Sequence, residues 1–207
     1  GGSVGSLMSP QPVVEIQDAG GSPITIDPDG GVTETVSLTF TAGTNEEGAI
    51  LSGSTTSNIN WSTGQATFSD LTVDLVGSYQ LQASTNAVSS TTDSNAFSVT
   101  AGAPAQLVYI VQPTTNTTAG EAINPAVEVQ VLDVLGNVVT TANNSITLAI
   151  KDNPGGGTLS GTLTLAAVNG VASFSDISID KAQSEYTLDA TASGLSAATS
   201  ASFDIAV

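Results

Sequence analysis

The sequence predicts an all-β protein that consists of two tandem β-sandwich domains. Three observations support this prediction: a segment of about 100 residues occurs twice, apolar residues alternate with polar ones, and Gly, Pro and Asn separate the alternating runs. The composition agrees, because Thr and Val favour strands while Gly, Ser and Asn supply turns. No stretch of the 207 residues has the 3.6-residue apolar period of an amphipathic helix.

The repeat is clearest in a nine-residue phrase, ATFSDLTVD (66–74), which returns as ASFSDISID (172–180). Matches continue on both sides in the same order, with small length changes in the loops. The further matched pairs are PVVEIQDAGGSPI (12–24) with PAVEVQVLDVLGNVV (125–139), AILSGS (49–54) with TLSGT (158–162), GSYQLQAST (77–85) with SEYTLDATA (184–192), and NAFSVT (95–100) with ASFDIA (201–206). This pattern indicates duplication of a whole domain.

The matched segments set the predicted domain boundaries. One sandwich is expected over residues 12–101 and the other over residues 106–207. Residues 102–105 are expected to be a linker, because Gly102 and Pro104 would interrupt any strand there.

The two halves differ at their start. The second half has a full first strand, Leu107–Gln112, whereas the first half has only the Gly-rich residues 1–11 in the corresponding place. We therefore expect a first sandwich that lacks a complete first strand, and an unpaired edge is a template for another strand. Two explanations remain open: a boundary cut through a longer array of repeats, or strand donation by this tail between chains, which would make a filament.

Alternation with a period of two locates the strands of the second half. Val127, Val129 and Val131, for example, alternate with polar residues, which puts one face of a strand in a core and the other in water. The Asn169-Gly170 pair predicts a type I′ hairpin turn, since both residues tolerate positive φ. The seven expected strands lie near residues 106–112, 126–133, 145–151, 158–167, 171–179, 185–192 and 199–206. An odd number of antiparallel strands leaves the termini at opposite ends, so such domains can be joined in line.

Paired residues inside the repeated phrase indicate structural roles. Phe68 and Phe174 are expected to point into equivalent cores. Asp70 and Asp176 are expected to bond backbone amides at equivalent bends. The alternative, a pair of catalytic carboxylates, is disfavoured because the two residues lie at equivalent places in different domains.

Tyr79 and Tyr186 each begin the penultimate strand, in the pattern Tyr-x-Leu-x-Ala. Immunoglobulin-type sandwiches often place a Tyr there, with its hydroxyl bonded to a nearby backbone group. Leu81 and Leu188 then stand where antibody domains have Cys. The alternative is an ordinary half-buried Tyr.

Three long segments of the second half have a familiar pattern. They are AGAPAQLVYIVQP (101–113), TAGEAINPAVEVQVLDVLGNVV (118–139) and GGTLSGTLTLAAVNGVASFSDISIDKAQSEYTLDATASGLSAATSASFDI (156–205). Together they resemble the tandem immunoglobulin-like repeats of large bacterial secreted and cell-surface proteins, including invasin- and intimin-like adhesins. The resemblance covers nearly all of residues 104–207 and, more loosely, residues 12–100. It implies a spacer or adhesive stalk, and since its motifs are structural it specifies the fold better than any activity.

The charge and the missing residue types exclude several function classes. The net charge is −17, with 19 acidic residues against Lys151 and Lys181, so a polyanionic nucleic acid would be repelled. The chain has no Cys and no His, which removes thiol nucleophiles, a Ser-His-Asp triad and the usual zinc ligands. We therefore expect no enzyme activity. No apolar run is long enough to insert into a bilayer, and the Cys-free, Thr- and Ser-rich composition favours an extracellular or cell-surface location.

Two loop features are candidate ligand sites. Asp27 and Asp29 resemble part of a calcium loop, the only cofactor that the sequence suggests, although an acidic turn is the simpler interpretation. Trp61, the single Trp, would stack a sugar ring if exposed, or else anchor its loop on the core.

These observations predict a structural extracellular repeat unit of a cell-surface stalk, adhesin or filament, with neighbouring copies or repeats of the same protein as partners. The alternative is a carbohydrate- or protein-binding accessory module of a larger secreted protein.

Overall fold

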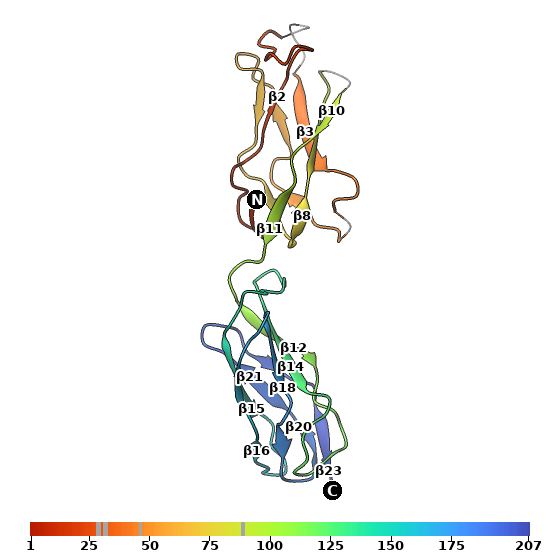
Figure 1. The fold of residues 1–207 in the computed structure, drawn as a ribbon, viewed down its shortest axis with the longest axis vertical. Helices are drawn as coiled ribbons and strands as arrows, with labels where there is room; N and C mark the ends of the chain where they lie inside the picture. The colour runs from red at the N-terminus through yellow and green to blue at the C-terminus, as the bar shows by residue number, and fades with distance from the viewer. Residues whose placement is uncertain (28–29, 31–32, 46, 88–89) are drawn as a thin grey trace. The chain divides into compact units, whose positions relative to one another are not determined.

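The computed structural model in Figure 1 describes residues 1–27, 30, 33–45, 47–87 and 90–207. Every regular element assigned in these residues is a β-strand, so the fold is all-β, as predicted. The chain forms two compact units, Gly1–Ala101 and Gly102–Val207. Among the described residues, no helix has the length and apolar character needed to cross a bilayer.

The first unit contains eleven of the assigned strands. They are β1 (Gly2–Ser3), β2 (Val13–Glu15), β3 (Thr35–Phe40), β4 (Leu51–Ser52), β5 (Thr56–Asn58), β6 (Gln65–Thr67), β7 (Thr72–Val73), β8 (Gly77–Tyr79), β9 (Leu81–Thr85), β10 (Thr91–Asp93) and β11 (Phe97–Thr100). Within the described residues they pair as β1-β11-β8, β10-β9-β3-β5, β2-β6 and β4-β7.

The second unit contains twelve strands. They are β12 (Gln106–Val111), β13 (Thr117–Thr118), β14 (Val127–Leu132), β15 (Ser145–Ile150), β16 (Leu159–Ser160), β17 (Thr164–Ala166), β18 (Val171–Phe174), β19 (Ser178–Ile179), β20 (Gln183–Tyr186), β21 (Leu188–Thr191), β22 (Ala198–Thr199) and β23 (Phe203–Ala206). They pair as β13-β23-β20, β22-β21-β15-β17, β12-β14-β18 and β16-β19.

The two units have the same strand topology, with a single difference. β1 to β11 correspond in order to β13 to β23, and every pairing of the first unit recurs in the second. Only β12 has no counterpart among the described residues of the first unit. The prediction that the first sandwich lacks its complete first strand is therefore confirmed.

Four of the seven predicted strands are interrupted in the second unit. The segment 158–167 breaks at Gly161, and the segment 171–179 breaks near Asp176. The segment 185–192 breaks at Thr187, between β20 and β21, and the segment 199–206 breaks between β22 and β23. At each break the chain passes from one set of paired strands to another. The Asn169-Gly170 turn has positive φ at both residues (52° and 79°), as a type I′ hairpin requires.

Alternate residues of the strands fill the two cores, as the period of two predicts. Phe68 of the first unit and Phe174 of the second are 4% and 0% exposed, so both lie in the cores that the repeat predicts for them. The largest fully buried side chains are concentrated in the second unit. They include Tyr186, Phe174, Phe203, Ile123, Ile146, Leu148, Ile177, Ile179 and Leu188.

Residues 1–11 belong to the first unit, which corrects the prediction of a separate tail. β1 pairs in parallel with β11. Val4 and Met8 are buried, and Met8 packs in the main apolar cluster. The Val4 N–H donates to the Thr100 carbonyl (2.9 Å), and the Met8 N–H donates to the Leu71 carbonyl (2.9 Å). The segment is thus an integral part of the sandwich.

The counterpart of this N-terminal segment lies inside the second sandwich, at residues 116–126. β13 pairs in parallel with β23, as β1 does with β11. The Ile123 N–H donates to the Ile177 carbonyl, just before β19, as the Met8 N–H donates to the Leu71 carbonyl, just before β7. This alignment places Pro10 opposite Pro125, which moves the predicted match by two residues.

Residues 102–105 belong to the second unit, which corrects the prediction of a free linker. The Gly102 N–H donates to Asp133 Oδ2 (2.9 Å), and the Ala105 N–H donates to the Leu132 carbonyl (2.8 Å). Burial raises the pKa of Asp133, but hydrogen bonds from the backbone of Gly102, Asn137 and Leu135 outweigh it and hold the pKa below its ordinary value. The ionised carboxylate therefore fixes the first residues of this unit.

Candidate functional site

The repeated phrase forms a bend clamped by its Asp. In the second unit, Asp176 Oδ1 accepts the Thr162 N–H (3.0 Å) and Oδ2 accepts the Thr162 hydroxyl (2.8 Å). In the first unit, Asp70 makes the same pair of bonds to Ser54 (2.9 and 2.8 Å). Each Asp thus ties the bend after β6 or β18 to the bend after β4 or β16. This arrangement leaves the two carboxylates in separate units, where they act on structure.

A glycine completes each clamp. Gly53 and Gly161 both have φ of +104°, a conformation that L side chains rarely adopt. A Cβ added at Gly161 would overlap the Asp176 carbonyl oxygen and lie 2.8 Å from its carbon, and the same holds for Gly53 and Asp70. The matched LSG segments of the sequence therefore mark a backbone contact that requires glycine.

Asp176→Asn is expected to destabilise the second unit at neutral pH and to matter less in acid. The backbone N–H and then the hydroxyl of Thr162 hold the pKa of Asp176 below its ordinary value of 3.8. Because the folded pKa is the lower one, ionised Asp176 stabilises the unit above about pH 4, and this contribution is lost as the pH falls through the folded pKa. Urea unfolding from about pH 7 to about pH 2.5 would show the difference between wild type and variant shrinking below about pH 4. A difference that stays constant to the acid limit would contradict this role.

The two repeated tyrosines are anchored on upstream backbone. The Tyr79 hydroxyl donates to the Leu75 carbonyl (3.1 Å), and the Tyr186 hydroxyl donates to the Lys181 carbonyl (3.1 Å). Both rings are buried, at 3% and 0% exposure. Each Tyr ends a short strand, β8 or β20, and one residue separates it from the start of β9 or β21. A Tyr at such a corner, bonded to backbone a few residues earlier, is typical of the immunoglobulin-like sandwich, and the paired sheets of each unit have that architecture.

Trp61 is half-buried at the turn between β5 and β6, where it packs against the main apolar cluster. Its indole N–H donates to Glu34 Oε2 (2.9 Å). Glu34 is only 4% exposed, and its Oε1 has no hydrogen-bond partner among the described residues. The indole thus anchors the turn on the core and partners a buried acid, a contact that the sequence pattern did not predict. Sugar stacking by Trp61 stays a prediction.

Trp61→Phe is expected to lower the free energy of unfolding of the first unit by about 1–3 kcal/mol. Phe keeps most of the ring packing but removes the N–H, so that neither oxygen of buried Glu34 would retain a partner among the described residues. Circular dichroism during urea unfolding measures the change. The effect should shrink when Glu34→Gln is also present, because a neutral amide is less costly to leave unpaired. An unchanged midpoint for Trp61→Phe would refute the anchoring role.

The predicted calcium loop is described only in part. Asp27 lies in an exposed loop, and its Oδ1 accepts a hydrogen bond from the Gly30 N–H (2.8 Å). Asp29 lies outside the described residues. Within the described ranges, no group of three or more acidic side chains is placed to hold a metal ion. Calcium binding therefore stays a prediction.

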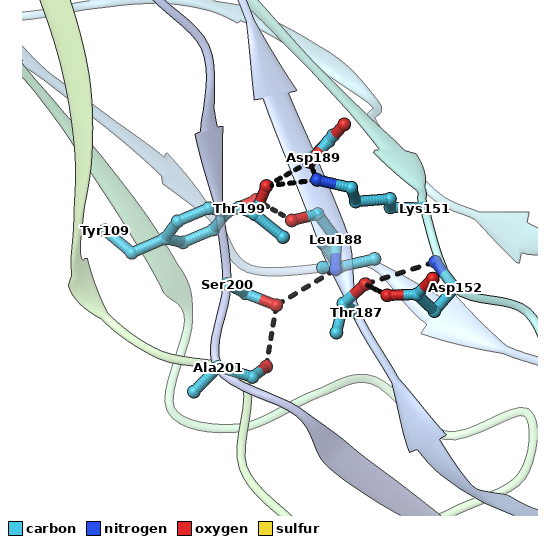
Figure 2. A network of polar contacts seen from close by, with 9 residues as sticks. All are labelled: Tyr109, Lys151, Asp152, Thr187, Leu188, Asp189, Thr199, Ser200 and Ala201. Carbon is cyan, nitrogen blue, oxygen red and sulfur yellow. Dashed lines mark hydrogen bonds and ion pairs between the residues drawn. The ribbon is translucent and has the colours of Figure 1, made fainter.

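β12 is the strand that distinguishes the two units. In the second unit it occupies a well-defined place beside β14, which we call the strand seat. It pairs antiparallel with β14, and its inward side chains Leu107 and Tyr109 are 6% and 7% exposed. The Tyr109 hydroxyl donates to the Leu188 carbonyl (3.1 Å), as Figure 2 shows. Farther along, the Ala201 N–H donates to Gln112 Oε1 (2.8 Å). β12 and the adjoining Gln112 are therefore bonded to β14 on one side and to Leu188 and Ala201 on the other.

Polar contacts hold the wall of this seat in both units. In the second unit, the Thr199 hydroxyl donates to Asp189 (2.6 Å) and accepts from Lys151 (2.8 Å), which also pairs with Asp189 (3.4 Å; Figure 2). In the first unit, Asp93 accepts from both Gln82 and Thr41 (3.1 Å each). Different side chains thus fix β10 and β22 in the same position.

In the first unit the equivalent seat is an open groove. Two adjoining hollows of about 530 and 280 Å³ run between β2 and β10, and they share a lining that includes Val14, Ala83 and Thr92. Leu38 and Leu81 line the larger hollow, and their counterparts in the second unit, Leu148 and Leu188, are fully buried. No described residue of the first unit occupies the groove as β12 does in the second. The sequence signal for it is the missing match to Leu107–Gln112.

Each unit has a serine at the same structural position, and comparing the two shows the effect of β12. Ser94 accepts a hydrogen bond from the Leu81 N–H (2.9 Å) and donates to the Asn95 carbonyl (2.8 Å). Ser200 makes the same two bonds at the same lengths in the second unit. Ser200 is 7% exposed, whereas Ser94 is exposed. The local structure is thus the same with and without a first strand, and only the covering differs.

Comparison with known proteins gives distant similarities. No family model and no curated protein matches the chain. Among solved structures, it is similar to the D0-D1 domain of intimin, with 20% identity over 88% of this chain and 87% of that chain (TM-score 0.34). Domains 5-6 of the S-layer protein SbsC share 16% identity over 99% and 91% of the two chains (TM-score 0.32).

A beta-glycosidase from Bacteroides vulgatus shares 15% identity over 84% of this chain (TM-score 0.43), and the chain spans 21% of that protein. Because these identities and TM-scores are low, the fold assignment rests on the strands, pairings and tyrosine anchors described above.

Proposed function

We propose that the chain is a structural repeat unit that works outside the cell, as part of a surface stalk, adhesin or filament. The observation that carries the proposal is the path of the chain through the second unit. It enters beside the Asp133 loop, where Gly102 is bonded, and leaves at the opposite end after β23 (Figure 1). A domain entered at one end and left at the other suits serial connection.

The strand pairing at the exit suits resistance to a pulling force. β23 pairs in parallel with β13 and antiparallel with β20. Hydrogen bonds of such ladders lie across the strands, so a force along β23 shears several bonds together instead of opening them one by one. The buried side chains Phe203 and Ile205 would leave the core in the same step.

Assembly through strand addition is the finer part of the proposal. Donation by residues 1–11 would require Val4 and Met8 to leave a packed core, so we propose the first unit as the acceptor of a strand and not as its donor. The glycine-rich segment then has a stabilising role within its own sandwich.

Pulling a single molecule from its two ends tests the load-bearing role. We expect two separate unfolding events, each lengthening the chain by roughly 30 nm, since a unit of about 100 residues extends by up to about 3.5 Å per residue. Featureless extension at low force would refute the mechanical role. Antibody labelling of intact cells of the source organism tests the location, and labelling only after lysis would refute an extracellular site.

A further inference from the structure

We propose that the groove beside β2 is a binding site for an extended, uncharged β-strand supplied by another polypeptide chain. The bound strand would run antiparallel to β2 and place two apolar side chains, two residues apart, in the groove. The second unit provides the pattern, because β12 occupies the equivalent seat with Leu107 and Tyr109 inward. The intermolecular source of the strand rests on the proposed structural function, whereas the acceptor geometry stands apart from it.

The backbone of β2 is set to receive such a strand. The Ile16 N–H donates to the Gly64 carbonyl on the side of β6. Because backbone groups alternate in direction along a strand, the N–H and C=O groups of Val13 and Glu15 face the groove. In the second unit, Val131 donates to Gly170 in the same way, and the neighbouring residues of β14 pair with β12. Among the described residues of the first unit, this edge of β2 has no partner strand, and such an edge is a template for strand addition.

The groove is also apolar where a strand would place its inward side chains. Leu38, Leu81 and Ala83 line it, and each corresponds to a fully buried residue of the second unit, where β12 is present. Val13 at the edge is 55% exposed, although it is a β-branched residue in a strand. An inserted strand would cover these groups and the exposed Ser94.

Charge disfavours an acidic occupant. The charged side chains that line the two hollows, Glu15 and Asp93, are both acidic, and the whole chain carries a net charge of −17. An acidic segment would be repelled, whereas Gln106–Val111 has no charged side chain. The lining is therefore compatible with strands of the composition of β12 and disfavours the chain's own acidic loops.

Binding of a synthetic peptide AQLVYIVQ, the sequence of residues 105–112, to the full chain tests the proposal. We expect saturable binding with one peptide per chain, and slower hydrogen exchange at the Glu15 amide when the peptide is bound. A peptide with Asp at the positions of Leu107 and Tyr109 should not bind. A chain that carries residues 106–115 joined before Gly1 should also fail to bind the peptide, because its groove is filled.

Two substitutions at one edge position provide the matched control. Val13→Pro removes the N–H that faces the groove, at a site where an edge strand tolerates proline, and should weaken binding at least about tenfold. Val13→Ala keeps the N–H and should bind within about twofold to threefold of wild type. Absence of binding at millimolar peptide, or equal binding by Val13→Pro, would overturn the proposal. Either result would leave the two unfolding events of the pulling experiment unchanged, so the proposed function is tested separately.

Discussion

Gly161→Ala is expected to lower the free energy of unfolding of the second unit by about 3 kcal/mol or more. Two effects add. The backbone has φ of +104°, which an alanine rarely adopts, and the new Cβ would overlap the carbonyl oxygen of Asp176. Because that carbonyl belongs to the clamped bend, it cannot move without loosening the bonds from Asp176 to Thr162. Scanning calorimetry measures the loss as a lower transition for this unit.

Gly194→Ala is the matched control for that substitution. Gly194 also has a positive φ (77°), but nothing lies within 4 Å of an added Cβ. Its effect should be limited to backbone strain of about 1 kcal/mol. Trp61 fluorescence, which reports on the first unit alone, should be unchanged by both substitutions. Equal effects of the two alanines would mean that the contact with Asp176 is not a tight one.

Deletion of residues 1–11 is expected to unfold the first unit while the second stays folded. The deletion removes two buried apolar side chains, Val4 and Met8, each of which contributes about 1.5–3 kcal/mol. It also removes β1 and the backbone bonds to Leu71 and Thr100. The total is comparable with the whole stability of a small domain, which is about 5–15 kcal/mol. Trp61 fluorescence and circular dichroism would show the first unit unfolded without denaturant.

Neighbouring residues of the same segment provide the control. Met8→Asp places a charge in the core and should destabilise the first unit strongly, whereas Leu7→Asp should have little effect because Leu7 is 59% exposed. A deletion variant that keeps a cooperative transition of the first unit would contradict this account. It would instead support a dispensable tail that is free to be donated.

Sequence periodicity predicted most of the fold, because each signal has a local physical cause. A strand with one buried face needs apolar residues at every second position, as at Val127, Val129 and Val131, which are all fully buried. A two-residue hairpin needs positive φ, which Asn169 and Gly170 supply. Duplication then located the same features in the first half, where the individual patterns are weaker.

The place of residues 1–11 was not predictable in the same way. Gly5 and Pro10 are the only residues of the first ten that match their counterparts in 116–125. The segment is held largely by backbone bonds, which nearly any sequence can make, and by Val4 and Met8 packing into a core defined elsewhere in the chain. Its alignment with residues 116–125 therefore follows from the strand pairings of the structure and not from sequence identity.

The candidate sites also divide into features that the sequence predicted and features that it did not. The repeated phrase predicted the bends with Asp70 and Asp176, but nothing local indicated that Glu34 is buried under Trp61. That contact joins residues from different strands, so it depends on the tertiary arrangement. The groove beside β2 was foreshadowed by the missing first strand, yet its lining residues come from segments more than 60 residues apart.

Amide hydrogen exchange of the free chain tests the central claim, that the two units are one sandwich of which the first has an open strand seat. The Glu15 amide should exchange rapidly, whereas the equivalent Gln130 amide, which faces β12, should be protected. Ile16 and Val131 provide the internal control, because their amides point away from the groove and donate to the carbonyls of Gly64 and Gly170. Both amides should therefore be protected. Protection of Glu15 equal to that of Gln130 would show that the seat is already filled and would contradict the account.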